Sequence, residues 1–230
     1  MRNISYKEKG SKISAKDSRR FAPTQNAEEI VLKWPLFSLA IGLVTLGLGI
    51  TALQYGSDPD EIILFCFFFL VAGMSFHYVE CYIYPGNFIA DFNRSYFQSL
   101  YEDIPYSPRM ALFINFLGLY FASIILTLAT YYVSMIGFIP LGMMLAHGIK
   151  VLSFALSEKA YTPGCMTSAL ILIPYPLLAS FQLIANGNIS RQGFAAGFLL
   201  GWAFYTLSLA YLRHRWQAKQ KALGKKGPAG

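Results

Sequence analysis

The sequence predicts an all-α fold: a polytopic membrane helical bundle of about six transmembrane helices, with the N and C termini cytoplasmic. Of the 230 residues, 55% are hydrophobic and 13% are charged, whereas soluble domains average roughly 25% charged residues. The apolar residues gather in long stretches, and the basic residues gather at the two ends of the chain. Together these observations indicate an integral membrane protein, with no room for a separate soluble domain.

The uneven charge fixes the expected ends of the membrane domain. The first 33 residues hold eight Lys/Arg and four Asp/Glu, and the tail from Arg213 holds six Lys/Arg and no acid. A nucleic-acid-binding protein would carry its basic residues on a folded surface, so no nucleic-acid partner is expected. Basic termini beside apolar spans are typical of cytoplasmic tails attracted to membrane lipids. We expect a polar tail at 1–33, a transmembrane domain at 34–212 and a basic tail at 213–230.

Six stretches meet the requirement of about 20 mostly apolar residues for a transmembrane helix. They are residues 34–54, 62–84, 109–133, 136–156, 164–185 and 192–212. An even number of spans agrees with two cytoplasmic termini.

Two of these spans carry features that shape helices. The fifth contains Pro174 and Pro176, which should kink it and release backbone carbonyls. The sixth carries Gly193, Gly197 and Gly201 on one face. That spacing allows a second helix to approach closely, within the chain or across a dimer seam, and packing within the chain is the more common outcome.

The longest loop, residues 85–108, is rich in aromatic residues and is expected to be an interfacial segment with a helix from Asn87 to Tyr101. Aromatic side chains suit the headgroup region of a bilayer. Those in this segment are Phe88, Phe92, Tyr96, Phe97 and Tyr101.

Three ionisable residues inside the spans are the main indication of function. His77 and Glu80 lie in the second span and His147 lies in the fourth. Such residues are costly in a bilayer and usually face a bundle interior, a partner or a cavity. His77 and Glu80 are three residues apart and therefore share a helix face.

Their depth supports a common site. At 1.5 Å rise per residue, His77 and Thr167 lie about 12 Å from the cytoplasmic ends of their spans, Asn115 about 9 Å and His147 about 16 Å. Polar side chains of four successive spans thus share one layer in the cytoplasmic half. We expect a polar pocket there, with Tyr161 at its rim.

Each of these residues also has a plainer interpretation. Asn115 and His147 can be single interhelical hydrogen-bonding residues. Glu80 and Lys150, which shares a face with His147, can extend toward the membrane surface.

Four functional hypotheses follow. In the first, His77, Glu80 and His147 hold Zn²⁺ or iron with a water in the open position, and Asn115 orients a ligand in an enzyme acting on a lipid or another apolar substrate. Cys81 points about 100° away from Glu80 on an ideal helix and is not counted as a ligand. In the second, Glu80 and a histidine form a metal-free acid–base pair.

The third hypothesis is a non-catalytic accessory subunit of a larger membrane protein complex, with the basic tails and the 85–108 loop docked to other subunits. The fourth is a transporter. The sequence shows no internal repeat, which disfavours the fourth, because many transporter folds are built from repeats.

The membrane core of the sequence, roughly residues 60–180, also resembles the HXXEE-domain membrane protein family. The resemblance lies in the following matches: His77-Tyr78-Val79-Glu80, Asn115 with Gly118, His147, Tyr161-Thr162-Pro163-Gly164, Thr167-Ser168-Ala169 and Ile173-Pro174. It implies an integral membrane protein suspected of being an enzyme without a defined reaction. It also implies His77, Glu80, Asn115 and His147 as the site, with Cys81 standing where the family name calls for a second acid.

Overall fold

A computed structural model describes residues 25–55, 59–99, 104–115, 138–185 and 190–224 of the chain. The described residues are helical and contain no strand. The elements are α2 (Gln25–Tyr55), α3 (Pro59–Tyr82), α4 (Phe88–Ser95), α5 (Pro108–Ala111), α7 (Phe138–Glu158), α8 (Cys165–Thr167), the π-helix η4 (Ser168–Leu172), α9 (Pro174–Ala185) and α10 (Arg191–Gly224).

Five helical stretches of the described chain are long and apolar enough to cross a membrane. They are residues 33–54, 63–82, 138–158, 165–185 and 192–218. The predicted membrane class is therefore supported for five of the six spans. The remaining one, 109–133, falls largely outside the described residues, and the cytoplasmic placement of the termini remains a prediction.

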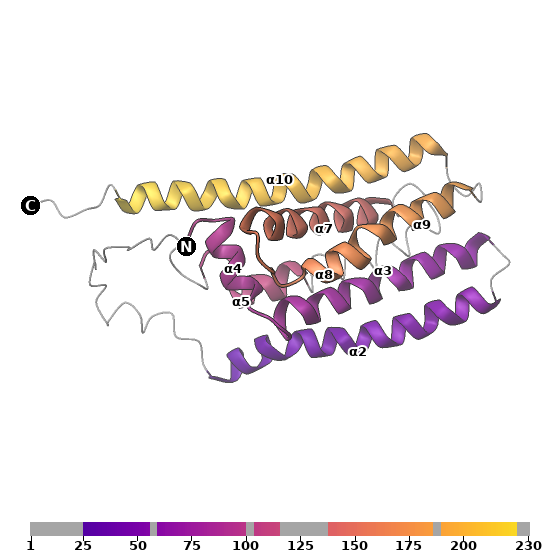
Figure 1. The fold of residues 1–230 in the computed structure, drawn as a ribbon, viewed down its shortest axis with the longest axis horizontal. Helices are drawn as coiled ribbons and strands as arrows, with labels where there is room; N and C mark the ends of the chain where they lie inside the picture. Colours follow the sequence, from indigo (N-terminus) through magenta and orange to yellow (C-terminus); the bar gives the residue numbers. More distant parts are fainter. Residues whose placement is uncertain (1–24, 56–58, 100–103, 116–137, 186–189, 225–230) are drawn as a thin grey trace, which may run out of the picture.

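The long helices lie side by side in an elongated bundle (Figure 1). α2 packs along α3, and α10 packs along α7, while the η4–α9 segment contacts both α3 and α7. Large apolar side chains remain exposed on the outer helices, including Phe37 and Val44 on α2 and Phe204 and Leu207 on α10. Such continuous exposed apolar surface suits contact with lipid.

The glycine face of the sixth span packs within the chain. A Cβ at Gly201 would collide with the backbone of Ile139 on α7, and one at Gly142 would collide with the backbone of Phe198 on α10. Paired small residues thus let the two backbones touch, and the interpretation as intramolecular packing is confirmed at Gly201.

The fifth span is broken where its prolines predict a disturbance. The α-helical pattern of α8 passes into the π-helix η4, and Ile173 N–H donates to the carbonyl of Ser168, 3.0 Å away. α9 then begins at Pro174. A π-helical turn of this kind often marks a functional site, and here it follows the segment that contains Thr167.

A helix is present in the predicted interfacial segment, but it is shorter than expected, and its aromatic side chains face inward. α4 ends at Ser95, and Phe88, Phe92, Tyr96 and Phe97 are buried in a cluster with residues of α7 and α10. Tyr101 lies outside the described residues. The expectation that these rings face the headgroups was wrong, because they pack on one another and against Phe154 of α7.

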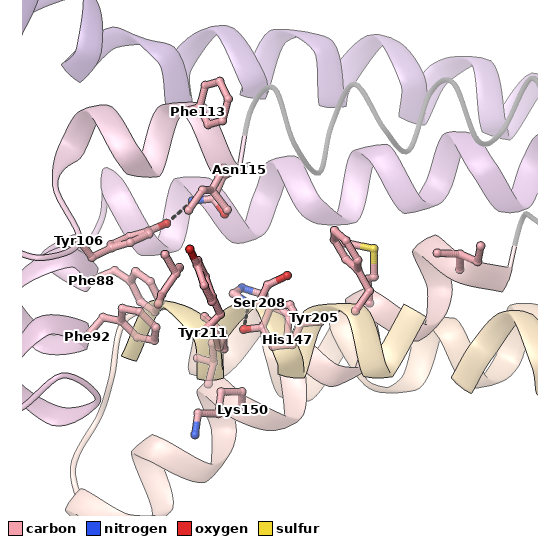
Figure 2. A pocket seen from close by; sticks show the side chains of 17 residues that line it. Phe88, Phe92, Tyr106, Phe113, Asn115, His147, Lys150, Tyr205, Ser208 and Tyr211 are labelled. Carbon is pink, nitrogen blue, oxygen red and sulfur yellow. Dashed lines mark hydrogen bonds between the residues drawn. The ribbon is translucent and has the colours of Figure 1, made fainter. Parts of the chain in front are cut away.

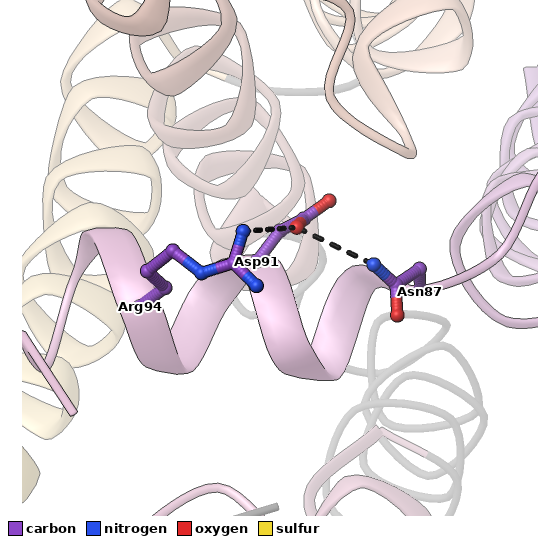
Figure 3. A network of polar contacts seen from close by, with 3 residues as sticks. All are labelled: Asn87, Asp91 and Arg94. Atoms are coloured by element: carbon purple, nitrogen blue, oxygen red, sulfur yellow. Dashed lines mark hydrogen bonds and ion pairs between the residues drawn. The ribbon is translucent and has the colours of Figure 1, made fainter. Parts of the chain in front are cut away.

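The polar face of α4 carries a small ion-pair network (Figure 3). Arg94 lies 3.9 Å from the Asp91 carboxylate, and the Asn87 amide donates to the same carboxylate oxygen at 3.4 Å. These contacts are solvent-accessible and contribute little to stability. α4 is thus held mainly by its aromatic face.

The helices extend into both predicted tails. α2 begins at Gln25, and α10 continues past residue 212 through the basic residues to Gly224. The membrane domain and the tails are therefore joined by continuous helix.

Candidate functional site

The two histidines predicted from their depth meet in the centre of the bundle. His77 on α3 and His147 on α7 place their Nε2 atoms 2.8 Å apart, with the ring planes at 90°. His77 is fully buried and His147 is 8% exposed. A nitrogen pair at this distance shares one hydrogen bond, in which one ring donates and the other accepts.

Thr167 connects this pair to Glu80. Its hydroxyl oxygen lies 2.8 Å from His77 Nδ1 and 2.6 Å from Glu80 Oε2. His77 and Glu80, three residues apart on α3, are thus joined through a side chain of the broken fifth span. His77 and Glu80 therefore share a helix face as the sequence predicts, and the Thr167 hydroxyl bridges their side chains.

The Glu80 carboxylate accepts four hydrogen bonds. Tyr161 Oη donates to Oε1 at 2.6 Å and Met166 N–H donates to Oε1 at 3.0 Å. Thr167 donates to Oε2 from its backbone N–H at 2.7 Å and from its hydroxyl at 2.6 Å. Bonds to an ionised group are stronger than neutral ones, so these four donors stabilise a buried carboxylate that has no ion pair with the described residues.

The rim of this site is formed by the turn between α7 and α8. Tyr161 is half-exposed there, and burial of its hydroxyl together with the Glu80 hydrogen bond raises its pKa. Tyr161 therefore remains a donor at neutral pH. Gly164, at φ +90°, makes the turn that brings Met166 and Thr167 to the carboxylate.

A fifth residue, Tyr205, extends this series of hydrogen bonds beyond His147. Tyr205 on α10 places its hydroxyl 2.8 Å from His147 Nδ1. Because the Thr167 hydroxyl donates to Glu80, His77 Nδ1–H must donate to Thr167, and His147 Nε2–H to His77. Tyr205 then donates to His147. The protons of all four hydrogen bonds point toward Glu80.

The geometry departs from the predicted three-ligand metal site. No group of three or more His, Cys, Asp or Glu side chains within the described ranges is arranged to hold a metal ion. Two imidazoles bound to one tetrahedral Zn²⁺ at about 2.0–2.1 Å would have nitrogens roughly 3.4 Å apart, against the 2.8 Å between His77 and His147. The Glu80 carboxylate also faces α8. Zinc or iron ligation by these residues remains a prediction.

Asn115 belongs to a different cluster from the histidines. Its Nδ2 donates to the hydroxyl of Tyr82 at 2.6 Å and to that of Tyr106 at 2.7 Å, and its backbone carbonyl accepts from the Tyr78 hydroxyl at 3.1 Å. It has no hydrogen bond to His77, Glu80 or His147 among the described contacts. The structure brings the other three predicted residues together and keeps Asn115 apart.

The two clusters meet across a cavity of about 530 Å³, lined mainly by apolar and aromatic side chains. Figure 2 shows Tyr106 and Asn115 on one side of it and His147, Tyr205 and Ser208 on the other. Cavities of this size that are mostly apolar, with a few converging polar groups, are typical of small-molecule sites.

Lys150 also lines the cavity. Its Nζ lies 4.6 Å from the ring centre of Tyr96 and 4.7 Å from that of Phe154. These are two cation–π contacts, in which aromatic faces attract the ammonium group. The extension of Lys150 toward the membrane surface stays a prediction.

Two residues of the site were missed from the sequence. Cys81 Sγ lies 3.3 Å from His77 Nε2, and Cys81 is buried. Around the helix, Cys81 points about 100° away from Glu80, but it lies four residues after His77, and this i, i+4 spacing predicts the contact. Tyr205 gave no signal, because tyrosines are common in membrane helices near the interface.

Comparison with known proteins identifies the family of this chain. The family model described as a protein of unknown function with an HXXEE motif matches residues 61–179. The match covers more than half of the chain, which therefore belongs to this family. No curated protein and no solved structure matches the chain. The matched range contains His77, Glu80, Asn115, His147 and Thr167, whereas Tyr205 lies beyond it.

Proposed function

We propose that this chain is a membrane-embedded acid–base enzyme that transfers a proton to and from an apolar, lipid-like substrate held in the cavity. The observation that carries the proposal is the unbroken chain of hydrogen bonds from the cavity wall to Glu80. It runs through Tyr205, His147, His77 and Thr167. Tyr205 is the residue of this chain that offers a hydroxyl to the cavity.

Proton removal uses each link of the chain once. A substrate X–H bond breaks, its electron pair remains on X, and the proton goes to the Tyr205 oxygen. The phenol proton passes to His147 Nδ1, the His147 Nε2 proton to His77, and the His77 Nδ1 proton to Thr167. The hydroxyl proton of Thr167 then reaches Glu80 Oε2. The substrate has lost one proton and Glu80 has gained it.

The same chain can return the proton. After the shift every hydrogen bond points toward the cavity, so Glu80 now donates to Thr167 and Tyr205 donates to the substrate. Removal at one substrate atom and return at another is what an isomerisation requires. An acid–base group positioned in this way contributes about 10²–10⁴-fold to a rate.

Carbon-bound deuterium provides an assay that needs no known substrate. The purified protein is incubated in D₂O with a total membrane lipid extract, returned to H₂O, and the lipids are searched by mass spectrometry for retained deuterium. We expect wild type to label a lipid, and Tyr205→Phe and His147→Gln to label it at least about 100-fold more slowly. Tyr211→Phe is the matched control, since Tyr211 lines the cavity outside the relay.

The same samples test the competing functions. Wild-type labelling that Tyr205→Phe leaves unchanged would overturn the relay. Labelling that depends on about one zinc or iron per chain, and is lost on chelation, would favour the metal-dependent enzyme instead. Absence of labelling by wild type would overturn the enzyme proposal and leave the accessory subunit.

A further inference from the structure

The wall of the cavity opposite the histidines holds an incomplete hydrogen-bond network. The Asn115 amide nitrogen donates both of its protons, one to Tyr82 and one to Tyr106. The two tyrosine hydroxyls lie 3.3 Å apart. These bonds fix the amide with its nitrogen toward the tyrosines, so Oδ1 is directed away from them.

Counting donors and acceptors leaves two polar groups unused. Tyr106 lines the cavity whereas Tyr82 does not, so the satisfied arrangement has Tyr82 donating to Tyr106. The Tyr106 oxygen then accepts two bonds, and its own proton has no acceptor within the described part of the chain. Asn115 Oδ1 likewise accepts no hydrogen bond from the described residues. One donor and one acceptor therefore belong to two hydrogen-bonded residues that both line the cavity.

Both groups keep these roles at physiological pH. Burial raises the pKa of Tyr106 to about 12, so its hydroxyl remains protonated. An amide oxygen does not titrate. A ligand that accepts from Tyr106 and donates to Asn115 Oδ1 would gain two hydrogen bonds at this wall.

From this pairing we infer that the substrate is an apolar alcohol: a hydrocarbon body with one hydroxyl group, which donates to Asn115 Oδ1 and accepts from Tyr106. The inference rests on the proposed function, because it names the substrate class of the same cavity. The aromatic walls, including Phe88, Phe92 and Phe113, would bury the hydrocarbon body, and the hydroxyl would be anchored across from Tyr205.

A neutral head group fits this cavity better than an anionic one. The cation that lines it, Lys150, already lies over the rings of Tyr96 and Phe154. The unused pair at Asn115 and Tyr106 offers one acceptor beside one donor. A carboxylate has no proton for the amide oxygen, whereas a hydroxyl matches both groups.

Three probes of equal chain length separate the two hydrogen bonds. Hexadecan-1-ol can make both, its methyl ether can only accept from Tyr106, and hexadecane makes neither. Binding to the purified full-length chain is measured in micelles at fixed detergent, by competition with tritiated hexadecan-1-ol. We expect wild type to bind the alcohol about tenfold more tightly than the ether, as one buried hydrogen bond allows.

Variants assign each bond to its residue. Asn115→Leu should bring the alcohol-to-ether ratio close to one. Tyr106→Phe should weaken alcohol and ether together relative to hexadecane, and it provides a second reading should Asn115→Leu fail to fold. Tyr84→Phe is the control, because Tyr84 is exposed and lies outside both the cavity and the Asn115 cluster, and it should keep the ratio.

Three outcomes would overturn the inference. The first is equal binding of alcohol and ether by wild type. The second is an alcohol-to-ether ratio that Asn115→Leu leaves unchanged. The third concerns hexadecanoate as an additional competitor: it binds more tightly than the other probes, and Lys150→Met abolishes that binding. The deuterium assay and the binding assay together separate the two proposals. Loss of deuterium transfer in wild type with the alcohol preference intact would reject the relay alone, and transfer without the preference would reject the alcohol alone.

Discussion

The carboxylate of Glu80 should be a structural anchor as well as the end of the relay, and Glu80→Gln tests this. Each carboxylate oxygen accepts two hydrogen bonds: Oε1 from Tyr161 and Met166, and Oε2 from the backbone and hydroxyl of Thr167. Glutamine keeps one oxygen and places an NH₂ group at the other position. In either orientation that NH₂ group faces a backbone N–H.

The cost follows from these four bonds. One buried N–H loses its acceptor, which costs about 1–3 kcal/mol, and the bonds that remain change from charged to neutral, each weakening by about 1 kcal/mol. We therefore expect Glu80→Gln to lower the free energy of unfolding by about 4–6 kcal/mol in total.

Unfolding in mixed micelles by SDS titration, followed by circular dichroism, measures this difference. Glu158→Gln is the matched control, because Glu158 is exposed at the end of α7, and such surface changes stay within about 0.5 kcal/mol. If Glu80→Gln were as stable as Glu158→Gln, the carboxylate would not hold α3 to α8 and the starting geometry of the relay would be wrong.

Three further changes probe the packing around the relay. Gly164→Ala should cost about 2–4 kcal/mol in the same titration, because Gly164 has φ +90° and its Cβ would lie 2.6 Å from the His77 ring. Gly201→Ala should cost about 1–3 kcal/mol, because its Cβ would meet the Ile139 carbonyl of a packed helix. The stability difference between wild type and Tyr161→Phe should be constant below pH 10 and vanish as the pH rises further.

The sign of the pH effect follows from the raised pKa of Tyr161. The unfolded chain loses the phenol proton first, near pH 10, so the stabilising hydrogen bond is lost as the pH increases. A difference that grew with pH would contradict this. For the glycine changes, Gly47→Ala is the control, since a Cβ there meets nothing within 4 Å, and a cost equal to that of Gly201→Ala would refute the close-packing argument.

The sequence predicted the centre of the site because depth in a membrane helix is a linear function of residue number. His77 and His147 were expected in one layer, and they touch. Thr167 was expected in the same layer, and it joins His77 to Glu80. The rise per residue determines height along the bundle, and it was sufficient for these residues.

The direction in which each side chain points around its helix could not be predicted from the sequence in the same way. Asn115 was expected at the height of the histidines, yet it bonds to Tyr82 and Tyr106, and Tyr106 comes from a loop without periodicity. The aromatic residues of α4 were assigned to the headgroups for a related reason. An aromatic belt and a buried aromatic cluster have the same composition, and the contacts with Phe154 decide between them.

The residue at position 81 bears on the proposed relay, which requires two neutral histidines. Position 81 faces His77 Nε2 at 3.3 Å, and it is the position where the family motif name has its second acid. A carboxylate there would be buried against the histidine pair and would require a compensating proton or metal ion. That added charge would change the protonation of the hydrogen-bonded residues, in which each bond now has one donor and one acceptor.

A buried thiol behaves as a small apolar group, so Cys81 leaves the number of protons on the His77–His147 pair unchanged. This departure from the motif therefore favours proton transfer through neutral imidazoles over metal ligation at this site.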